Sequence, residues 1–433
     1  MNDAALWSRA PKLSPTLAIN EAVKARIRGG DEIVHLGFGE AGVPVHPLLR
    51  QALAAASADG GYGEVAGSAA LRESIAAYYT RRGLDTERSQ IVVGPGSKAL
   101  LYALMIALEG DLVLPQPAWV SYGAQAMLAR KHVIPVPIPP ETGGIPDPAR
   151  LRAEVARARS AGRNPQLLLV TQPDNPTGTF PSRSRLEAVL SEAAACGLFV
   201  ISDEIYGDLV HTGKGFTSAA TISPTNCVLT SGLSKSMALG GWRVGVARVP
   251  DTTFGQALLD RVLAIASEIW SCIPGPVTAA AQLAYDEPPE IVAHVHASRR
   301  LHSQVSQTLY AAIQAVAGVT CRPPTAAFYL YPDLEGARGS LRASGVDGSS
   351  ALAHALLEEH GIAVLPGDAF GDDPSALRVR VAASLLYGTT DDERWAALEA
   401  AAADRAHELA SVMRAANRLH AALDALAAGR RAR

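Results

Sequence analysis

Ser231-Gly-Leu-Ser-Lys-Ser-Met-Ala-Leu-Gly-Gly-Trp-Arg-Val-Gly245 places one lysine among small and apolar residues, with an arginine eight positions later. A lysine becomes a nucleophile only if it loses its proton near neutral pH, and poorly hydrated walls with a nearby cation favour that loss. Leu233 and Met237 supply such walls, while Arg243 supplies the cation and a fork that fits phosphate oxygens. We interpret Lys235 as a Schiff-base lysine and Arg243 as an anion clamp; an exposed loop lysine beside a structural arginine is the alternative.

Apolar runs alternate with helical stretches from Pro47 to about residue 285. Short apolar runs separated by helices are typical of strands buried on both faces of a mainly parallel sheet, so we predict the α/β class. The predicted strands are Ile91–Val93, Leu112–Leu114, His132–Ile134, Leu167–Val170, Leu198–Ser202, Val228–Leu229 and Val244–Val249.

The texture changes beyond about residue 290. A long helix is predicted over 290–317, followed by strands at 327–331 and 377–381 with a helix over 349–360 between them. We therefore predict a smaller α/β domain that the N-terminal segment completes. The predicted division is 1–45 for the N-terminal arm and part of the small domain, 46–285 for the large domain, 286–400 for the small domain and 401–433 for a helical extension.

Composition limits the classes of partner. The chain has 433 residues, 48% of them apolar, and 39 basic against 42 acidic residues, so no basic field favours nucleic acid and a small molecule is the expected partner. Four scattered cysteines, Cys196, Cys227, Cys272 and Cys321, indicate a reducing compartment and no metal site. The N-terminus does not read as a signal peptide, and no apolar run has the length of a membrane span, so we expect a cytoplasmic protein without a membrane partner.

Candidate ligand-binding residues follow the predicted strands, at the edge where sites gather in parallel sheets. Gly94-Pro-Gly-Ser-Lys98 opens a helix and is suited to phosphate, but it is no Walker loop because Ser97 stands directly before the lysine, which makes an ATPase remote. Trp119, Asn175 and Asp203 could stack on, hydrogen-bond to and pair with a planar heterocycle. Their alternatives are a core residue, a turn residue and a helix N-cap.

Together these motifs resemble the fold-type I, pyridoxal-phosphate-dependent aminotransferases of class I/II, the aspartate aminotransferase-like group. The resemblance covers about residues 14 to 400. Its most specific part is Gly232–Gly245, which fits the family's cofactor-attachment pattern, and segments around Gly96, Trp119, Asn175 and Asp203 follow in the family's order.

The resemblance implies pyridoxal 5′-phosphate as cofactor and a role for each matching residue. Lys235 would form the Schiff base and serve as general acid and base, while Arg243 and Ser234 would hold the phosphate with the backbone at Ser97 and Lys98. Asp203 would pair with the pyridinium nitrogen so that the ring can accept electrons.

Further roles concern the ring and its neighbourhood. The resemblance implies that Asn175 and Tyr206 donate to the ring's phenolic oxygen and that Trp119 stacks on its face. The family often has a cis peptide bond before the proline of Asn175-Pro176.

The implied substrate contacts are Arg378, Gly39 and Asn175. Arg378 lies six residues before Ser384 and would clamp the α-carboxylate, and Gly39 would contact the bound substrate. Arg378 and Arg380, two apart on a predicted strand, would point the same way, with a structural salt bridge as the more usual role for Arg380. Tyr62 resembles the tyrosine that reaches the neighbouring subunit's phosphate, which implies a homodimer with shared active sites.

The implied reaction is ping-pong transfer of an amino group from an L-α-amino acid to a 2-oxo acid. Departures at Gly232, Glu40-Ala41, Ala326 and Arg380 leave the substrate open. The alternatives are a β- or γ-lyase, a cyclase or an O₂-using oxidase or hydroxylase on the same scaffold and, remotely, a non-catalytic regulator that senses the cofactor.

Overall fold

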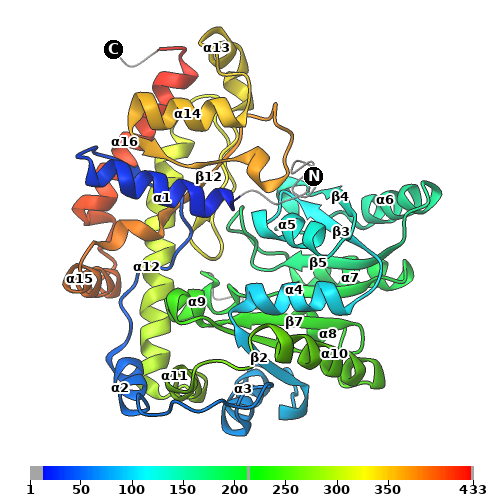
Figure 1. Ribbon diagram of the computed structural model, residues 1–433. Helices are drawn as coiled ribbons and strands as arrows, with labels where there is room; N and C mark the ends of the chain where they lie inside the picture. Colours follow the sequence, from blue (N-terminus) through cyan, green and yellow to red (C-terminus); the bar gives the residue numbers. More distant parts are fainter. Residues whose placement is uncertain (1–12, 212–214, 431–433) are drawn as a thin grey trace, which may run out of the picture.

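The computed structural model describes residues 13–211 and 215–430, and its main element is a seven-stranded sheet with strand order β2-β8-β7-β6-β5-β3-β4 (Figure 1). Only β8 runs antiparallel to its two neighbours; the other pairs are parallel. The strands are β2 Ile91–Pro95, β3 Asp111–Gln116, β4 Val133–Pro137, β5 Pro165–Thr171, β6 Phe199–Asp203, β7 Cys227–Gly232 and β8 Val244–Arg248. All seven predicted strands and the mainly parallel sheet are confirmed.

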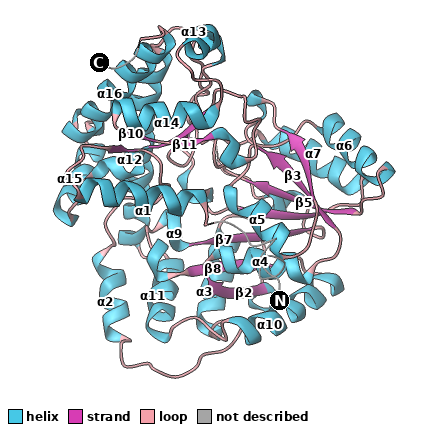
Figure 2. Ribbon diagram, turned by 45° about the horizontal axis from the view of Figure 1, so that its top comes forward, coloured by secondary structure: helices cyan, strands magenta, loops and turns pink. Residues whose placement is uncertain are grey.

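Helices cover both faces of this sheet (Figure 2). Alternate strand residues enter two separate cores: Val93 and Leu168 face one, and Val92 and Leu169 face the other. The first face is covered by α3 Ala69–Arg81, α6 Pro148–Ser160, α7 Arg183–Ala195, α8 Ala219–Ile222 and α11 Gly275–Asp286. The second is covered by α4 Ser97–Ala107, α5 Val120–Leu128 and α10 Thr253–Ile269. Burial on both faces explains why these strands are continuously apolar.

The rest of the chain builds a second core from distant segments. Its strands form an antiparallel sheet of order β11-β12-β9 and a parallel pair β1-β10. The strands are β1 Val34–His35, β9 Tyr329–Leu330, β10 Ile362–Ala363, β11 Leu365–Pro366 and β12 Val379–Ala382. The remaining helices are α1 Pro15–Arg28, α12 Pro289–Gln314, α13 Arg338–Ala343, α14 Ser349–His360, α15 Asp391–Ala402 and α16 Ala410–Ala427. Helix α2 Pro47–Ala55 lies beside α11 and buries Leu49 in the first core instead.

Helix α12 joins the two cores, as its course through Figure 1 shows. Ile291 near its start packs in the first core, whereas Leu301 and Leu309 pack in the second. The predicted extension at 401–433 is helical in much of its described part, and α16 buries Leu419 and Leu423 in that second core. The division into 1–45, 46–285, 286–400 and 401–433 stays a prediction, with residues up to 427 sharing the small-domain core.

Local signals fix several helix ends. Asp147 caps α6 through the Arg150 amide, ahead of Pro148 at the first helical position. Gly361 ends α14 in the left-handed conformation, at φ 60°. The Gly361 signal explains why the end of the predicted helix over 349–360 agrees with the end of α14.

Candidate active site

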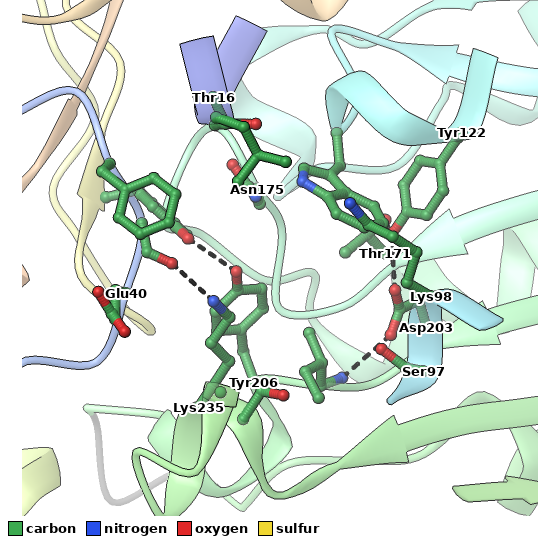
Figure 3. Close-up of a pocket in the computed structure, with 18 of the residues that line it drawn as sticks. Thr16, Glu40, Ser97, Lys98, Tyr122, Thr171, Asn175, Asp203, Tyr206 and Lys235 are labelled. Carbon is green, nitrogen blue, oxygen red and sulfur yellow. Dashed lines mark hydrogen bonds between the residues drawn. The ribbon is translucent and has the colours of Figure 1, made fainter. Parts of the chain in front are cut away.

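A cavity of about 490 Å³ opens at the carboxyl ends of the parallel strands, beneath the start of α1 (Figure 3). Residues from the large sheet, from α1 and from β9 and β12 line it, so both cores contribute. The lining residues are Thr16, Leu17, Phe38, Gly39, Glu40, Ser97, Lys98, Trp119, Tyr122, Thr171, Asn175, Asp203, Ile205, Tyr206, Ser234, Lys235, Gly240, Gly241, Arg243, Tyr329 and Arg380. Ten of the predicted site residues are therefore together, while Arg378 and Tyr62 lie elsewhere.

Lys235 lies on the short helix α9 Leu233–Ser236, directly after β7. Its Nζ donates to the Gly39 carbonyl at 2.6 Å (Figure 3). Burial lowers the pKa of Lys235 to about 8; Glu40 opposes this, and the nearby cations, Arg380 first among them, add to it. The amine is thus available as a nucleophile and proton acceptor at mildly alkaline pH.

An anion cradle lies at the start of α4. Gly96, at φ 88°, precedes the helix, and Ser97 and Lys98 of its first turn, whose amides have no acceptor within the helix, line the cavity. Arg243 donates to the Gly240 carbonyl at 2.7 Å and to the Pro95 carbonyl at 3.2 Å, and no described carboxylate pairs with it. A Cβ on Gly96 would lie 2.1 Å from Arg243 Nη2, so a side chain at this position would displace the guanidinium. The cradle offers amides and an unneutralised cation to a phosphate.

Gly232 stands where many members of the resembled family have serine or threonine, and its backbone leaves no space for either. A Cβ there would lie 2.4 Å from the Val244 carbonyl oxygen of the adjacent strand. The phosphate end therefore lacks that hydroxyl because β7 and β8 approach too closely.

Asp203 ends β6 and is 3% exposed. Tyr122 donates to its Oδ2 at 2.8 Å and the Ile205 amide donates to its Oδ1 at 3.3 Å, but no described cation forms an ion pair with it. Burial raises the pKa of Asp203 to about 6, against the effect of these donors. A buried carboxylate without a cation is suited to a protonated ring nitrogen.

Tyr206 and Tyr329 join their hydroxyls at 2.7 Å beside Lys235. Tyr329 also presses on Gly39, where a Cβ would lie 2.2 Å from the tyrosine hydroxyl. Trp119 packs edge-on against Tyr122, and the Lys98 ammonium lies 5.0 Å from its ring centroid. The roles of Tyr122, Thr171 and Tyr329 were missed from the sequence, because the residues they contact are far along the chain.

The prediction that Arg378 clamps the substrate carboxylate is wrong. Arg378 lies before β12 begins, donates to Asp333 at 2.7 Å and to Asp372 at 3.0 Å, and borders a different cavity. Arg378 forms an isolated β-bridge with Asp333 just before the regular strand, and its side chain pairs with Asp333 and Asp372 instead of lining the cavity beside Arg380.

Arg380 occupies the place expected of Arg378. It is 1% exposed, lines the active-site cavity and has no described carboxylate partner. Its Nη2 donates to the Gly37 carbonyl at 2.7 Å and its Nη1 to Asn175 Oδ1 at 3.3 Å, while the buried Nε has no partner. An unneutralised buried guanidinium with an unused donor fits a carboxylate ligand, so the expected structural salt bridge is also wrong.

Two other expectations have different outcomes. The cis peptide bonds precede Pro117 and Pro173, and the bond between Asn175 and Pro176 is not among them. Tyr62 is 93% exposed and lies outside the cavity, so its contact with a neighbouring subunit stays a prediction.

The residues present fit pyridoxal 5′-phosphate. The cradle at Gly96 and Arg243 suits its phosphate, the unpaired Asp203 suits its ring nitrogen, and the Lys235 amine lies in the same cavity for its aldehyde. Arg380 remains for a substrate carboxylate.

Known proteins are similar to this chain in sequence and in fold. The family model for aminotransferase class I and II matches residues 32–389. The aspartate aminotransferase of Geobacillus stearothermophilus is 32% identical over 413 residues, covering 90% of this chain and 97% of that protein. The asparagine–oxo-acid transaminase of Streptococcus mutans is 30% identical, covering 86% and 93%.

A solved structure agrees. The aspartate aminotransferase from Thermus thermophilus with maleate superposes with a TM-score of 0.77 at 28% identity, covering 92% of this chain and 98% of that one.

In the described part of this chain, none of the helices is both long and apolar enough to cross a membrane. The chain belongs to the class I and II aminotransferases and is a pyridoxal-phosphate-dependent transaminase acting on an amino acid and an oxo acid.

Proposed function

We propose that in this transaminase Lys235 is the proton-transfer residue and Arg380 the α-carboxylate clamp of a ping-pong cycle between an L-α-amino acid and a 2-oxo acid. The observation that carries the proposal is the convergence of the Lys235 amine, the Asp203 carboxylate and the Arg380 guanidinium on one buried cavity.

Each half of the cycle needs the same work from the protein. Arg380 grips the α-carboxylate and so orients the Cα–H bond, and the Lys235 amine takes the proton from Cα and later returns one to the cofactor side. When bound, the cofactor's ring supplies an electron sink for the pair left on Cα. With the cofactor bound, Asp203 would keep the ring nitrogen protonated, and Asn175 and Tyr206 would hydrogen-bond to the ring's phenolic oxygen.

Backbone amides at Ser97 and Lys98, together with Ser234 and Arg243, would hold the cofactor's phosphate, and Trp119 would cover one face of its ring. Anchoring through the phosphate would keep the cofactor in the site when it is not bonded to Lys235.

A substrate with a second carboxylate is supported by the relatives. Two of them are named aspartate aminotransferase, and the Thermus protein was solved with maleate, which has two carboxylates. After Arg243 is assigned to phosphate and Arg380 to the α-carboxylate, Lys98 is the remaining described arginine or lysine that lines the cavity besides Lys235. We therefore infer a short dicarboxylic donor held in part by Lys98.

A donor comparison tests this class. The enzyme should use L-aspartate with a higher kcat/KM than L-asparagine, its neutral isostere. Lys98→Met should lower kcat/KM for L-aspartate only, and so reduce the ratio of the two kcat/KM values. An unchanged ratio in Lys98→Met would show that another group recognises the side chain.

The transaminase mechanism is tested at Lys235. Lys235→Ala should abolish turnover and the visible absorbance of the lysine-bound cofactor. Lys131→Ala is the matched control, because Lys131 also donates to backbone carbonyls but lies outside the cavity. Normal turnover in Lys235→Ala would refute the role of this lysine.

Product analysis separates the other reactions of this scaffold. Amino acid added alone should yield one equivalent of oxo acid and then stop. Continued release of ammonia, with or without O₂ uptake, would indicate a lyase, cyclase or oxidase instead.

We also infer a homodimer in which Tyr62 contacts the partner's phosphate site. Its exposed side chain on a single chain supports this. Analytical ultracentrifugation should show a dimer. Tyr62→Phe should weaken cofactor binding without dissociating the dimer. A monomer with full activity would refute the inference. The free cysteines support the predicted cytoplasmic location.

A further inference from the structure

The Asp203 carboxylate is one end of a buried chain of hydroxyl groups that the proposed roles leave unused. Thr171 Oγ1 donates to the Tyr122 hydroxyl at 2.8 Å, and Tyr122 in turn donates to Asp203 Oδ2 at 2.8 Å (Figure 3). Three different elements supply the chain: Thr171 ends β5, Tyr122 lies on α5, and Asp203 ends β6.

The direction of this chain is set by its last member, because the ionised Asp203 carboxylate can only accept. The Tyr122 hydroxyl has one proton to donate, and its oxygen accepts the proton of Thr171. The tyrosine proton is therefore left to point at Asp203, and the side chains have little freedom to rearrange, since Tyr122 is 1% and Thr171 6% exposed. Thr171 acts on Asp203 only through Tyr122.

We propose that Thr171 and Tyr122 are positioning residues that keep the Asp203 carboxylate ionised and aimed at the cofactor's ring nitrogen. The inference rests on the cofactor site described above and assigns a function to two residues outside the set that binds phosphate, ring substituents or substrate.

The charges around Asp203 support a need for such a device. The ionisable groups that face it are Tyr122 from α5, Lys235 from α9 and Tyr206 from the segment after β6. Burial raises the pKa of Asp203, and hydrogen bonding from Tyr122 is the largest influence that lowers it. A donated hydrogen bond stabilises the charged carboxylate and makes it a weaker base. The proton shared between Asp203 and the ring then stays on the ring nitrogen.

Removal of single hydroxyl groups tests the relay, by which we mean the chain of hydrogen bonds from Thr171 through Tyr122 to Asp203. Tyr122→Phe removes the donor to Asp203, and Thr171→Val removes the group behind it. Tyr387→Phe is the matched control: its hydroxyl is also buried and bonded, to His302 Nδ1 at 2.6 Å, but in the second core. The measurement is the affinity of each protein, freed of cofactor, for pyridoxamine 5′-phosphate between pH 5 and 8, since this probe cannot bond covalently to Lys235.

For the wild type, the affinity should fall as pH drops through about 6, where Asp203 becomes protonated. In Tyr122→Phe the midpoint should rise by about one pH unit, so that binding at pH 6 is about fivefold weaker than in the wild type. Thr171→Val should shift the midpoint in the same direction by less, and should add nothing in the Tyr122→Phe background. Tyr387→Phe should follow the wild-type curve, as the probe's own phosphate titrates alike in all of them.

A Tyr122→Phe curve that coincides with the wild type would overturn the relay, and so would equal shifts by Thr171→Val in both backgrounds. A wild type that fails to bind the probe would instead overturn the cofactor site itself. A second readout uses enzyme loaded with cofactor labelled with ¹⁵N in the ring: the ¹⁵N resonance should move toward the unprotonated position in Tyr122→Phe and stay unchanged in Tyr387→Phe. A merely structural role for Tyr122 would leave that resonance unmoved.

Discussion

Replacing Arg380 by lysine should cost this enzyme far more activity than the same change at Arg378. Arg380 is 1% exposed and reaches the cavity with an unpaired Nε, so an α-carboxylate can receive charge-assisted hydrogen bonds from a planar fork. Lysine keeps the charge but cannot present that fork. Loss of such a pair in a desolvated site costs about 3 kcal/mol, which corresponds to about a 100-fold fall in kcat/KM.

Arg378→Lys is the control because its partners are known. Arg378 pairs with Asp333 and Asp372 outside the cavity and is partly exposed, so the change should lower stability by about 1 kcal/mol or less and kcat/KM by no more than about threefold. The assay is initial-rate kinetics with an amino-acid donor, alongside thermal unfolding of each variant. A larger loss in Arg378→Lys than in Arg380→Lys would refute the assignment of the carboxylate to Arg380.

Two further outcomes follow from the geometry of the cofactor end. The cofactor-free protein should capture pyridoxal 5′-phosphate at a rate, measured by absorbance, that increases as pH rises through about 8 and then levels off. The reason is that the pKa of Lys235 is lowered from 10.5 and only the neutral amine attacks. A rate that still increases near pH 10 would contradict this. Gly96→Ala should weaken cofactor binding at least about tenfold, because it displaces Arg243. The control is Gly162→Ala, which also has a positive φ but has open space around it and should leave binding unchanged. Equal effects of the two changes would show that backbone strain alone causes the loss.

The large sheet could be predicted from the sequence because its strands obey a simple physical rule. Strands buried on both faces must be apolar throughout, and runs such as Leu167–Val170 stand out between helical stretches. The cofactor residues could be placed as well, since the carboxyl ends of parallel strands meet at one edge of the sheet. Lys98, Trp119, Asn175 and Asp203 each follow such a strand and share one cavity.

The error at Arg378 has a local cause. Spacing to Ser384 and the alternation of strand side chains both pointed to it, but the strand begins one residue later and the two nearby aspartates hold Arg378 away from the cavity. Asp372 is six residues from Arg378, but Asp333 is 45 residues away, and the sequence does not reveal that the two aspartates meet at this arginine. The contact between Tyr122 and Asp203 was hidden for the same reason, because the two residues are 81 positions apart in the sequence.

The two ends of the cavity therefore differ in how they are built. This difference explains why the cofactor could be predicted from the sequence and the substrate could not. The cofactor end is built on strand ends and on the first turn of α4, where regular geometry fixes each position. The substrate end is assembled from α1, the loop at Phe38 to Glu40 and β12, which come from irregular or distant segments. Selection among amino acids depends on that end, so changes at Glu40 can alter substrate choice while the machinery at Lys235 stays the same.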